Sequence, residues 1–410
     1  MSELSLDFRL AINMARQFNG FFIVNVFFAF ILFYLIKKGF SKHIIKFHCF
    51  LSVLGQDSAR HYLARSYALN NRLDEAIQLC EFIIEHNSKS IETYYLLSDC
   101  YRLKNELPKA YSVLIPVLNI SKRLKTWLFL SNLVNTKHEF ECLVDLWGEY
   151  NRKGLVPRYH YEVNGYIVTA ALRAKAYKDA VFIVQELLAN VNNKDFVFPV
   201  ASKKKFTTNN AQRALLDLKK ILDGNQICFF LVSGTLLGCI RNNKLLGHDK
   251  DIDIGVWGDT SHHVLLNAIS SSGIFDISPI RSEYVLRVKH VNGVAIDLFY
   301  HYRTESNYWH GGSKLKWSNS PFQLVYHEFL RTKFLIPKDY DLYLTENYGD
   351  WRLENTDFDS SFDTTNSEII NYHEMEVHAY KKIIFHMKTG EQVKVECYKK
   401  RLMDIQRNNQ

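Results

Sequence analysis

The pattern of hydrophobic and polar positions divides the chain into three kinds of segment. Residues 21–36 form an apolar run that only Asn25 interrupts. Residues 56–195 repeat helical spacings, whereas residues 210–355 mix helical spacings with short apolar or alternating segments typical of strands. The pattern therefore predicts a multidomain chain with a single N-terminal membrane helix, an all-α solenoid and a C-terminal α+β domain.

The apolar run is the candidate membrane anchor, which we assign to residues 19–38 behind a tail of residues 1–18. The apolar run itself, residues 21–36, rises about 24 Å as a helix, so flanking residues would have to extend it across a hydrocarbon core of about 30 Å. Lys37 and Lys38 follow the run where a signal peptide would have a small-residue cleavage site. A buried core helix is the alternative. More basic residues follow the run than precede it, which favours a cytoplasmic C-terminal side.

Residues 56–195 are predicted to form helical hairpins with an internal repeat. Six positions recur at an offset of 34, the period of tetratricopeptide repeats: Leu63 and Leu97, Tyr67 and Tyr101, Leu69 and Leu103, Asn71 and Asn105, Leu73 and Leu107, and Ala76 and Ala110. Two more degenerate hairpins are expected around residues 126–149 and 161–188. Such an array offers a concave surface to a protein partner, or it only spaces the domains.

The candidate chemistry begins after a predicted strand, Phe229–Val232, which ends at the turn Ser233-Gly234. A helix is expected next, and a glycine turn that leads into a helix N-terminus is a place where phosphate binds. The following strand carries Asp251 and Asp253, which share one face because side chains alternate along a strand. Carboxylates about 4 Å apart repel by about 4 kcal/mol at an effective dielectric near 20, so a proton, a basic group or a metal ion must offset them.

A third acid, Asp297, lies in the apolar segment Val294–Phe299. A carboxylate in such a strand is costly unless it is paired or metal-bound. Asn292-Gly293 predicts a hairpin that brings this strand into the sheet, where Asp297 can face Asp251 and Asp253. Taken singly, these features would be a solvated strand edge and a plain turn; in this order they suggest metal-assisted phosphoryl or nucleotidyl transfer.

The motifs closely resemble those of the LicD/fukutin family, within the polymerase-beta-like nucleotidyltransferase superfamily. The resemblance covers roughly residues 210–355 and rests on Ser233-Gly234-Thr235-Leu236-Leu237-Gly238, Arg241, Asp249–Gly255, Ile296–Phe299, Ile336–Asp339 and Glu346–Trp351. It implies transfer of a phospho-alcohol, such as phosphocholine or a polyol phosphate, from a CDP-linked donor to a glycan hydroxyl. A nucleotidyltransferase with another substrate, or an inactive scaffold that binds a glycan-assembly partner, remains an alternative.

The resemblance also implies roles for individual residues. Asp251, Asp253 and Asp297 are the expected catalytic residues and ligands of Mg²⁺ or Mn²⁺, with Asp297 either a ligand or a proton acceptor. Donor phosphates are expected at Ser233, Gly234, Thr235 and Arg241, whose planar fork suits phosphate. Asp249, Asp350 and Trp351 are expected to support the site or contact substrate. The family domain is assigned to residues 210–410, after a linker at residues 196–209.

Composition adds little to this interpretation. The chain has 410 residues, 47% hydrophobic and 23% charged, with a formal net charge of +8, which is compatible with phosphorylated substrates. Its 7 cysteines are scattered, so neither a zinc site nor a disulfide framework is predicted. No basic aromatic patch suggests nucleic acid. We expect a bacterial inner-membrane protein with a cytoplasmic catalytic domain, or alternatively a lumenal protein of the secretory pathway.

Overall fold

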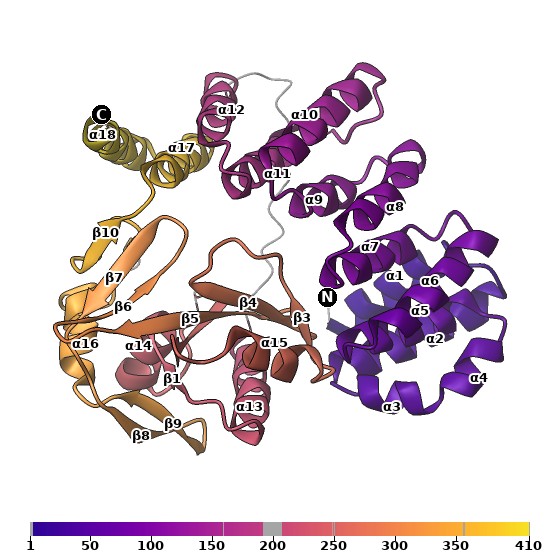
Figure 1. Cartoon of the computed structure of the whole chain (residues 1–410), viewed down its shortest axis with the longest axis horizontal. Coiled ribbons are helices and arrows are strands. Elements are labelled where there is room, and N and C mark those ends of the chain that lie inside the picture. Colours follow the sequence, from indigo (N-terminus) through magenta and orange to yellow (C-terminus); the bar gives the residue numbers. More distant parts are fainter. Residues whose placement is uncertain are drawn as a thin grey trace.

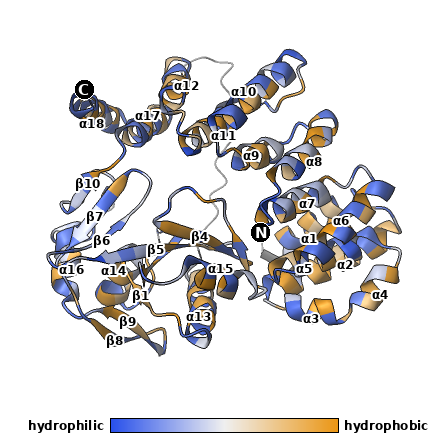
Figure 2. Cartoon of the chain, viewed as in Figure 1, coloured by the Kyte–Doolittle hydropathy of each residue, from blue (hydrophilic) through white to orange (hydrophobic). Residues whose placement is uncertain are grey.

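The computed structural model describes residues 3–158, 160–191, 207–247, 249, 251–355 and 357–409. Its helices form an array that runs from the N-terminal helices over the top of the view in Figure 1, and its strands form a sheet beside that array. Figure 2 shows hydrophobic and hydrophilic stretches alternating along the helices of the array. Most of the linker predicted at residues 196–209 lies outside the described residues.

The predicted membrane anchor is wrong. Its apolar run forms helix α2 (Phe22–Lys37), which packs against α1 (Glu3–Ala15) and against α5 (Asp57–Leu69). Among the described residues, no helix combines the length and the apolar character that crossing a bilayer requires. This finding overturns the single-pass topology, the membrane contact through one helix and both locations derived from it.

Polar contacts join α2 to neighbouring parts of the chain. Asn25 is fully buried; its side-chain amide donates to the Asn19 carbonyl at 2.9 Å, and its oxygen accepts from the Ser58 backbone N–H at 3.1 Å. At the other end of the helix, Lys37 pairs with Asp7 at 2.9 Å. Helix α2 buries only one face, through Asn25, Ala29, Leu32 and Ile36, so it also differs from the fully buried core helix that was the alternative. Two short helices, α3 (Ser41–Lys46) and α4 (His48–Val53), follow it.

Helical hairpins follow in the region where the repeat was predicted. They comprise α5 with α6 (Leu73–His86), α7 (Ile91–Leu103) with α8 (Leu107–Ile120), α9 (Leu124–Asn132) with α10 (Lys137–Arg152), and α11 (His160–Arg173) with α12 (Tyr177–Ala189). The repeat-related Asn71 and Asn105 lie at equivalent turns, with φ of 56° and 61°. Ala76 and Ala110 are fully buried, so paired helices approach closely there. The likeness to tetratricopeptide repeats itself stays a prediction.

The C-terminal tail extends this array. Helices α17 (Tyr372–Thr389) and α18 (Gln392–Asn408) form a hairpin, and α17 packs against α12 (Figure 1). Gln185 of α12 donates to the Tyr380 hydroxyl at 2.9 Å, and Tyr177 stacks on His373. The sequence indicated helices in this tail but no role for them. In space they continue the helical array beyond the point where the chain leaves it.

The catalytic sheet has 10 strands in the order β10-β7-β6-β5-β2-β1-β9-β8, with β4 also paired to β5 and β3 to β4. The strands are β1 (Phe229–Leu231), β2 (Asp251–Trp257), β3 (Phe275–Ile277), β4 (Val285–His290), β5 (Ala295–Arg303), β6 (Tyr308–Gly311), β7 (Leu315–Asn319), β8 (Leu324–Phe329), β9 (Thr332–Pro337) and β10 (Ser367–Ile369). Its helices are α13 (Thr208–Gly224), α14 (Ser233–Asn242), α15 (His262–Ser270) and α16 (Tyr340–Tyr348). The predicted hairpin of β4 and β5 is confirmed.

The N-terminal half of the array also contacts the sheet. Arg65 of α5 pairs with Asp276 of β3 at 2.5 Å, and Arg102 of α7 donates to the Ile277 carbonyl at 2.8 Å. The Ser41 hydroxyl donates to the carbonyl of Gly273 at 2.6 Å. Together with α17 at the other end of the array, these contacts attach the helices to the sheet domain at two separate places.

Candidate active site

Adjacent parallel strands bring the three predicted acids together. In the register of β2 and β5, Asp253 pairs with Asp297 and Asp251 pairs with Ala295. Ile252 and Ile254 are fully buried on the opposite face of β2, as the alternating pattern predicted. The arrangement follows from the period of two along a strand, which places Asp251 and Asp253 on the face that Asp297 also occupies.

Arg287 is a site residue that the sequence interpretation missed. Its Nε donates to Asp297 Oδ1 at 2.6 Å, and its Nη2 donates to Oδ2, so the guanidinium holds the buried carboxylate with both arms of its fork. Arg287 lies directly opposite Asp297 in the β4–β5 ladder. A two-residue turn at Asn292-Gly293 would have paired Arg287 with Leu298. The loop has three residues, because the His290 N–H donates to the Val294 carbonyl, and this shift by one position puts Arg287 opposite Asp297.

Electrostatic crowding is strongest at Asp253. Burial raises the pKa of its carboxyl well above the usual range, and the negative charges of Asp251, Asp297 and Asp249 raise it further. The positive charge of Arg287 acts in the opposite direction. The site therefore carries more negative charge than Arg287 alone offsets, and Asp253 is the carboxyl group on which this excess is concentrated.

Helix α14 begins at the turn beside these acids. Ser233 has φ of 48°, a conformation that non-glycine residues rarely adopt and that often marks functional sites. The first N–H groups of the helix have no partner within it, which makes the turn suitable for an anion. Gly234 lies against Asp249: a Cβ at this position would come within 2.8 Å of the carboxylate. The turn and the Asp249 loop are thus in close contact.

Thr235 has a different place from the one expected. It is only 2% exposed, and its hydroxyl accepts the backbone N–H of Asp253 at 2.9 Å. This bond ties α14 to β2 next to the acidic face. The Thr235 side chain therefore connects the first turn of α14 with the acidic strand β2, and it does not line the cleft.

The other predicted residues surround the same cleft. Arg241 approaches the carbonyl oxygen of Trp351 at 3.5 Å, and the Trp351 indole donates to Asp341 at 3.0 Å. Asp350 is exposed beside them. A cavity of about 860 Å³ connects the region, and except for Thr235 every predicted site residue lines it: Ser233, Gly234, Arg241, Asp249, Asp251, Asp253, Asp297, Asp350 and Trp351. Its other lining residues, which the sequence did not indicate, include Lys314, Trp317 and Tyr348.

The carboxylate oxygens in the cleft suit a hard cation such as Mg²⁺ only in part. Within the described ranges, no three histidine, cysteine or carboxylate side chains converge into a metal site by themselves. Asp251 and Asp253 offer carboxylate oxygens on one strand face, and a cation would relieve the crowding at Asp253. Mg²⁺ is often held by one or two carboxylates together with substrate phosphates. Asp297 is paired with Arg287, so its assignment as a third ligand stays a prediction.

Comparison with known proteins agrees with this geometry. Residues 226–339 match the family described as "LicD/FKTN/FKRP, nucleotidyltransferase domain". A stretch of 187 residues is 26% identical to human ribitol-5-phosphate transferase FKTN and 25% identical to the mouse protein. The match covers 43% of this chain and 39% of each relative, so the chain spans about two-fifths of the length of these relatives.

Residues 226–339 therefore form a domain of the LicD/FKTN/FKRP family, which confirms the resemblance predicted from the motifs. The domain contains β1, α14, β2 and β5, and with them the turn at Ser233 and all three acids. Its family supports a phosphotransferase as the class of enzyme. The helical array and the C-terminal hairpin lie outside the matched residues.

Proposed function

We propose that this chain transfers a phospho-alcohol from a CDP-linked donor to a hydroxyl group of a glycan. The observation that carries the proposal is the convergence of Asp251, Asp253 and Asp297 with the N-terminus of α14 in one cleft. Phosphocholine and polyol phosphates such as ribitol phosphate are the candidate groups. The human and mouse relatives are ribitol-5-phosphate transferases, which supports the second kind.

In this proposal the donor pyrophosphate lies between the acids and the first turn of α14. The N–H groups at Ser233 and Gly234 and the guanidinium of Arg241 bind phosphate oxygens. Mg²⁺ or Mn²⁺, held by Asp251 and Asp253, would neutralise charge on the pyrophosphate and on the departing CMP. Thr235 keeps α14 against β2 and so holds the anion-binding turn at a constant distance from the acids.

The reaction is a substitution at the phosphorus atom that carries the alcohol. The acceptor oxygen forms a new bond to this phosphorus, while the bond to the bridging oxygen of the pyrophosphate breaks and its electron pair leaves with CMP. The hydroxyl proton passes to a carboxylate of the acidic cluster. The fork of Arg287 on Asp297 keeps that carboxylate fixed beside the reacting groups.

The proposal is tested with purified full-length protein and a panel of CDP-choline, CDP-ribitol and CDP-glycerol. Release of CMP is followed with and without Mg²⁺, with a crude glycan fraction as acceptor. Metal-dependent release from one donor above the others supports the proposal and identifies the group transferred. No release from any CDP compound by folded protein would favour another nucleotide donor or a scaffold without activity.

A further inference from the structure

A second cavity lies between the catalytic sheet and the helical array. It has a volume of about 330 Å³ and is lined by the 279–282 loop, strand residues of β4 and β5, the 312–314 loop, and α17. Leu172 of α11 contributes as well, so both parts of the molecule form its walls. It shares Arg287, Asp297, Phe299, Lys314 and Trp317 with the cleft, and therefore adjoins the acidic cluster at Asp297.

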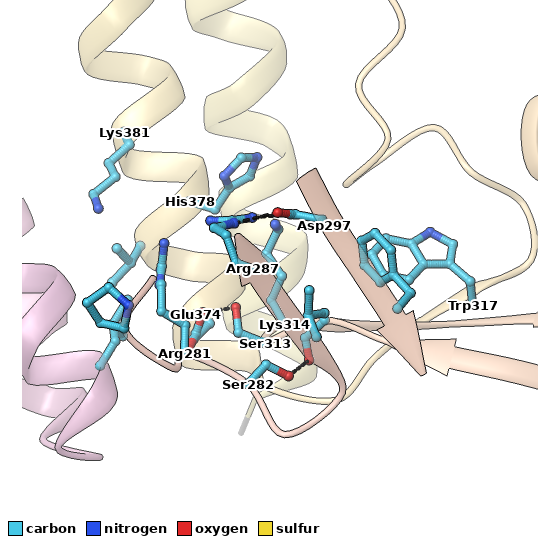
Figure 3. A pocket seen from close by; sticks show the side chains of 16 residues that line it. Arg281, Ser282, Arg287, Asp297, Ser313, Lys314, Trp317, Glu374, His378 and Lys381 are labelled. Carbon is cyan, nitrogen blue, oxygen red and sulfur yellow. Dashed lines mark hydrogen bonds and ion pairs between the residues drawn. The ribbon is translucent and has the colours of Figure 1, made fainter. Parts of the chain in front are cut away.

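Cationic side chains dominate this cavity. Figure 3 shows Arg281, Lys314 and Lys381 directing their charged ends into the space between the strands and α17. Within the part of the chain that the structure describes, none of the three has an ion pair or a side-chain hydrogen bond with the protein. They come from three separate segments, and thus their convergence depends on how the C-terminal hairpin packs.

The acids of the cavity do not neutralise these cations. Asp297 is already held by Arg287, and Glu374 accepts a hydrogen bond from the Ser313 hydroxyl at 2.5 Å. Apart from the Arg287–Asp297 pair, which is internally neutral, the cavity contains three cations and only one carboxylate, that of Glu374. Burial lowers the pKa of His378, so this imidazole is neutral near pH 7. The cavity consequently has an excess of positive charge, which Glu374, together with Asp359 near Lys314, offsets only in part.

This excess is unfavourable in the empty cavity. Burial first, and then the neighbouring charges of Arg281 and Lys314, lower the pKa of Lys381 to about 8, against the opposing effect of Glu374. Burial likewise lowers the pKa of Lys314. Like charges are rarely gathered in an enclosed space unless an anion is bound there, because charge-assisted hydrogen bonds to an oxyanion then replace the repulsion.

We propose that this cavity binds an oxyanion, of phosphate or sulfate type, carried by the acceptor glycan. The assignment of this anion to the acceptor rests on the proposed function, because that function places the donor phosphates at α14. A bound anion would orient the acceptor so that its hydroxyl reaches the acidic cluster through the shared residues. The C-terminal hairpin, which supplies Lys381, then takes part in selecting the acceptor.

The experiment measures binding and does not depend on turnover. Inorganic phosphate and sulfate are titrated calorimetrically into the full chain carrying Asp253→Asn, with and without saturating CDP. We expect both anions to bind in the presence of CDP, and Lys381→Gln and Arg281→Gln each to weaken them at least tenfold. Lys399→Gln, on the exposed side of α18, is the matched control and should leave binding unchanged.

The same variants separate an anion site from a merely structural cluster. If Lys381 stabilised the fold through an ion pair, Lys381→Gln would lower the melting temperature; an unsatisfied cation should leave it unchanged or raise it. Absence of phosphate and sulfate binding, or equal affinity in Lys381→Gln and the parent, overturns the inference. Intact anion binding without CMP release from any donor would instead count against the proposed function alone.

Discussion

Asp253 and Asp297 stand directly opposite each other on the adjacent parallel strands β2 and β5. Neighbouring strands lie about 4.8 Å apart, so two carboxylates in this register interact strongly. The protein partly offsets their repulsion with Arg287, which occupies the paired position on the other side of β5. Burial raises the pKa of Asp253, and the charges of Asp251 and Asp297 raise it further against the opposing effect of Arg287.

Replacing Arg287 is therefore predicted to damage the site more than the fold. Arg287→Gln removes the counter-charge of Asp297, which is only 5% exposed in its side chain. Since the arginine itself is 42% exposed, we expect the free energy of unfolding to fall by only about 1–2 kcal/mol, between the values for exposed and buried pairs. Donor turnover should fall at least tenfold, as CMP release and urea unfolding would show.

Arg287→Lys is the control for this change, because lysine keeps the charge but not the planar fork. It should restore most of the stability and only part of the turnover. Equal turnover in both variants and in the parent protein would mean that Arg287 does not position Asp297 for the reaction.

Gly234→Ala should reduce turnover with little change in stability. The added methyl group would lie 2.8 Å from Asp249 Oδ2 and 3.4 Å from its Cγ, so the loop that carries Asp249 must move away from the turn. Gly224→Ala has open space around the new methyl group and serves as the comparison. We expect CMP release to fall about tenfold or more only in the first variant; a normal rate there would show that the turn tolerates displacement of Asp249.

Anion binding in the second cavity is predicted to weaken above about pH 8. Lys381, with its pKa lowered to about 8, loses its positive charge as the pH rises through that value. The charged groups that act on Lys381 are Arg281, Lys314 and Glu374. Sulfate is the suitable probe because, unlike phosphate with its second pKa of about 6, it does not titrate between about pH 6.5 and about pH 9.5. Lys381→Gln should bind sulfate weakly at every pH in this range. If its sulfate affinity fell with pH as steeply as that of the parent protein, a group other than Lys381 would be losing its charge.

Docking of the array on β3 is tested by Gly273→Ala. A methyl group there would come within 2.5 Å of the Ser41 hydroxyl and 2.8 Å of the Asn70 side chain, and φ is +85°. Gly293→Ala has a similar φ of +97° but no atom within 4 Å, so it isolates the cost of the backbone conformation. We expect Gly273→Ala to destabilise by about 1–3 kcal/mol more, as overpacked sites do. Hydrogen exchange should then increase at β3 and at α3; equal exchange in both variants would argue against this contact.

The convergence of the three acids was predictable because it depends on local patterns. Alternation placed Asp251 and Asp253 on one face, and the Asn292-Gly293 turn placed Asp297 in the sheet. Arg287 was not predictable in this way, because the loop between β4 and β5 has three residues, and a two-residue Asn292-Gly293 turn would have placed Arg287 opposite Leu298. Residues that line the cleft from β6 and β7, such as Trp317, were not, because those strands carry no distinct pattern and pair only through the tertiary fold.

The error at α2 has a physical origin. Mean hydropathy does not distinguish a helix surrounded by lipid from one surrounded by other helices, and only the length and Asn25 argued for the second. The packing of α17 and α18 against the helical array could not be predicted from the sequence either. Their contact with α12 joins segments far apart in the chain, and without a repeat signal in the tail no local pattern indicated it.

The most direct test of the central claim compares Asp253→Asn with Asp259→Asn. Asp259 belongs to the same domain, is 68% exposed in its side chain and pairs with Arg303 away from the cleft. With the preferred CDP-linked donor and saturating Mg²⁺, we predict that Asp253→Asn lowers CMP release by at least about a hundredfold, while Asp259→Asn leaves it unchanged. Equal rates in the two variants, both folded, would contradict the account, because the paired carboxylates of β2 and β5 would then not carry the reaction.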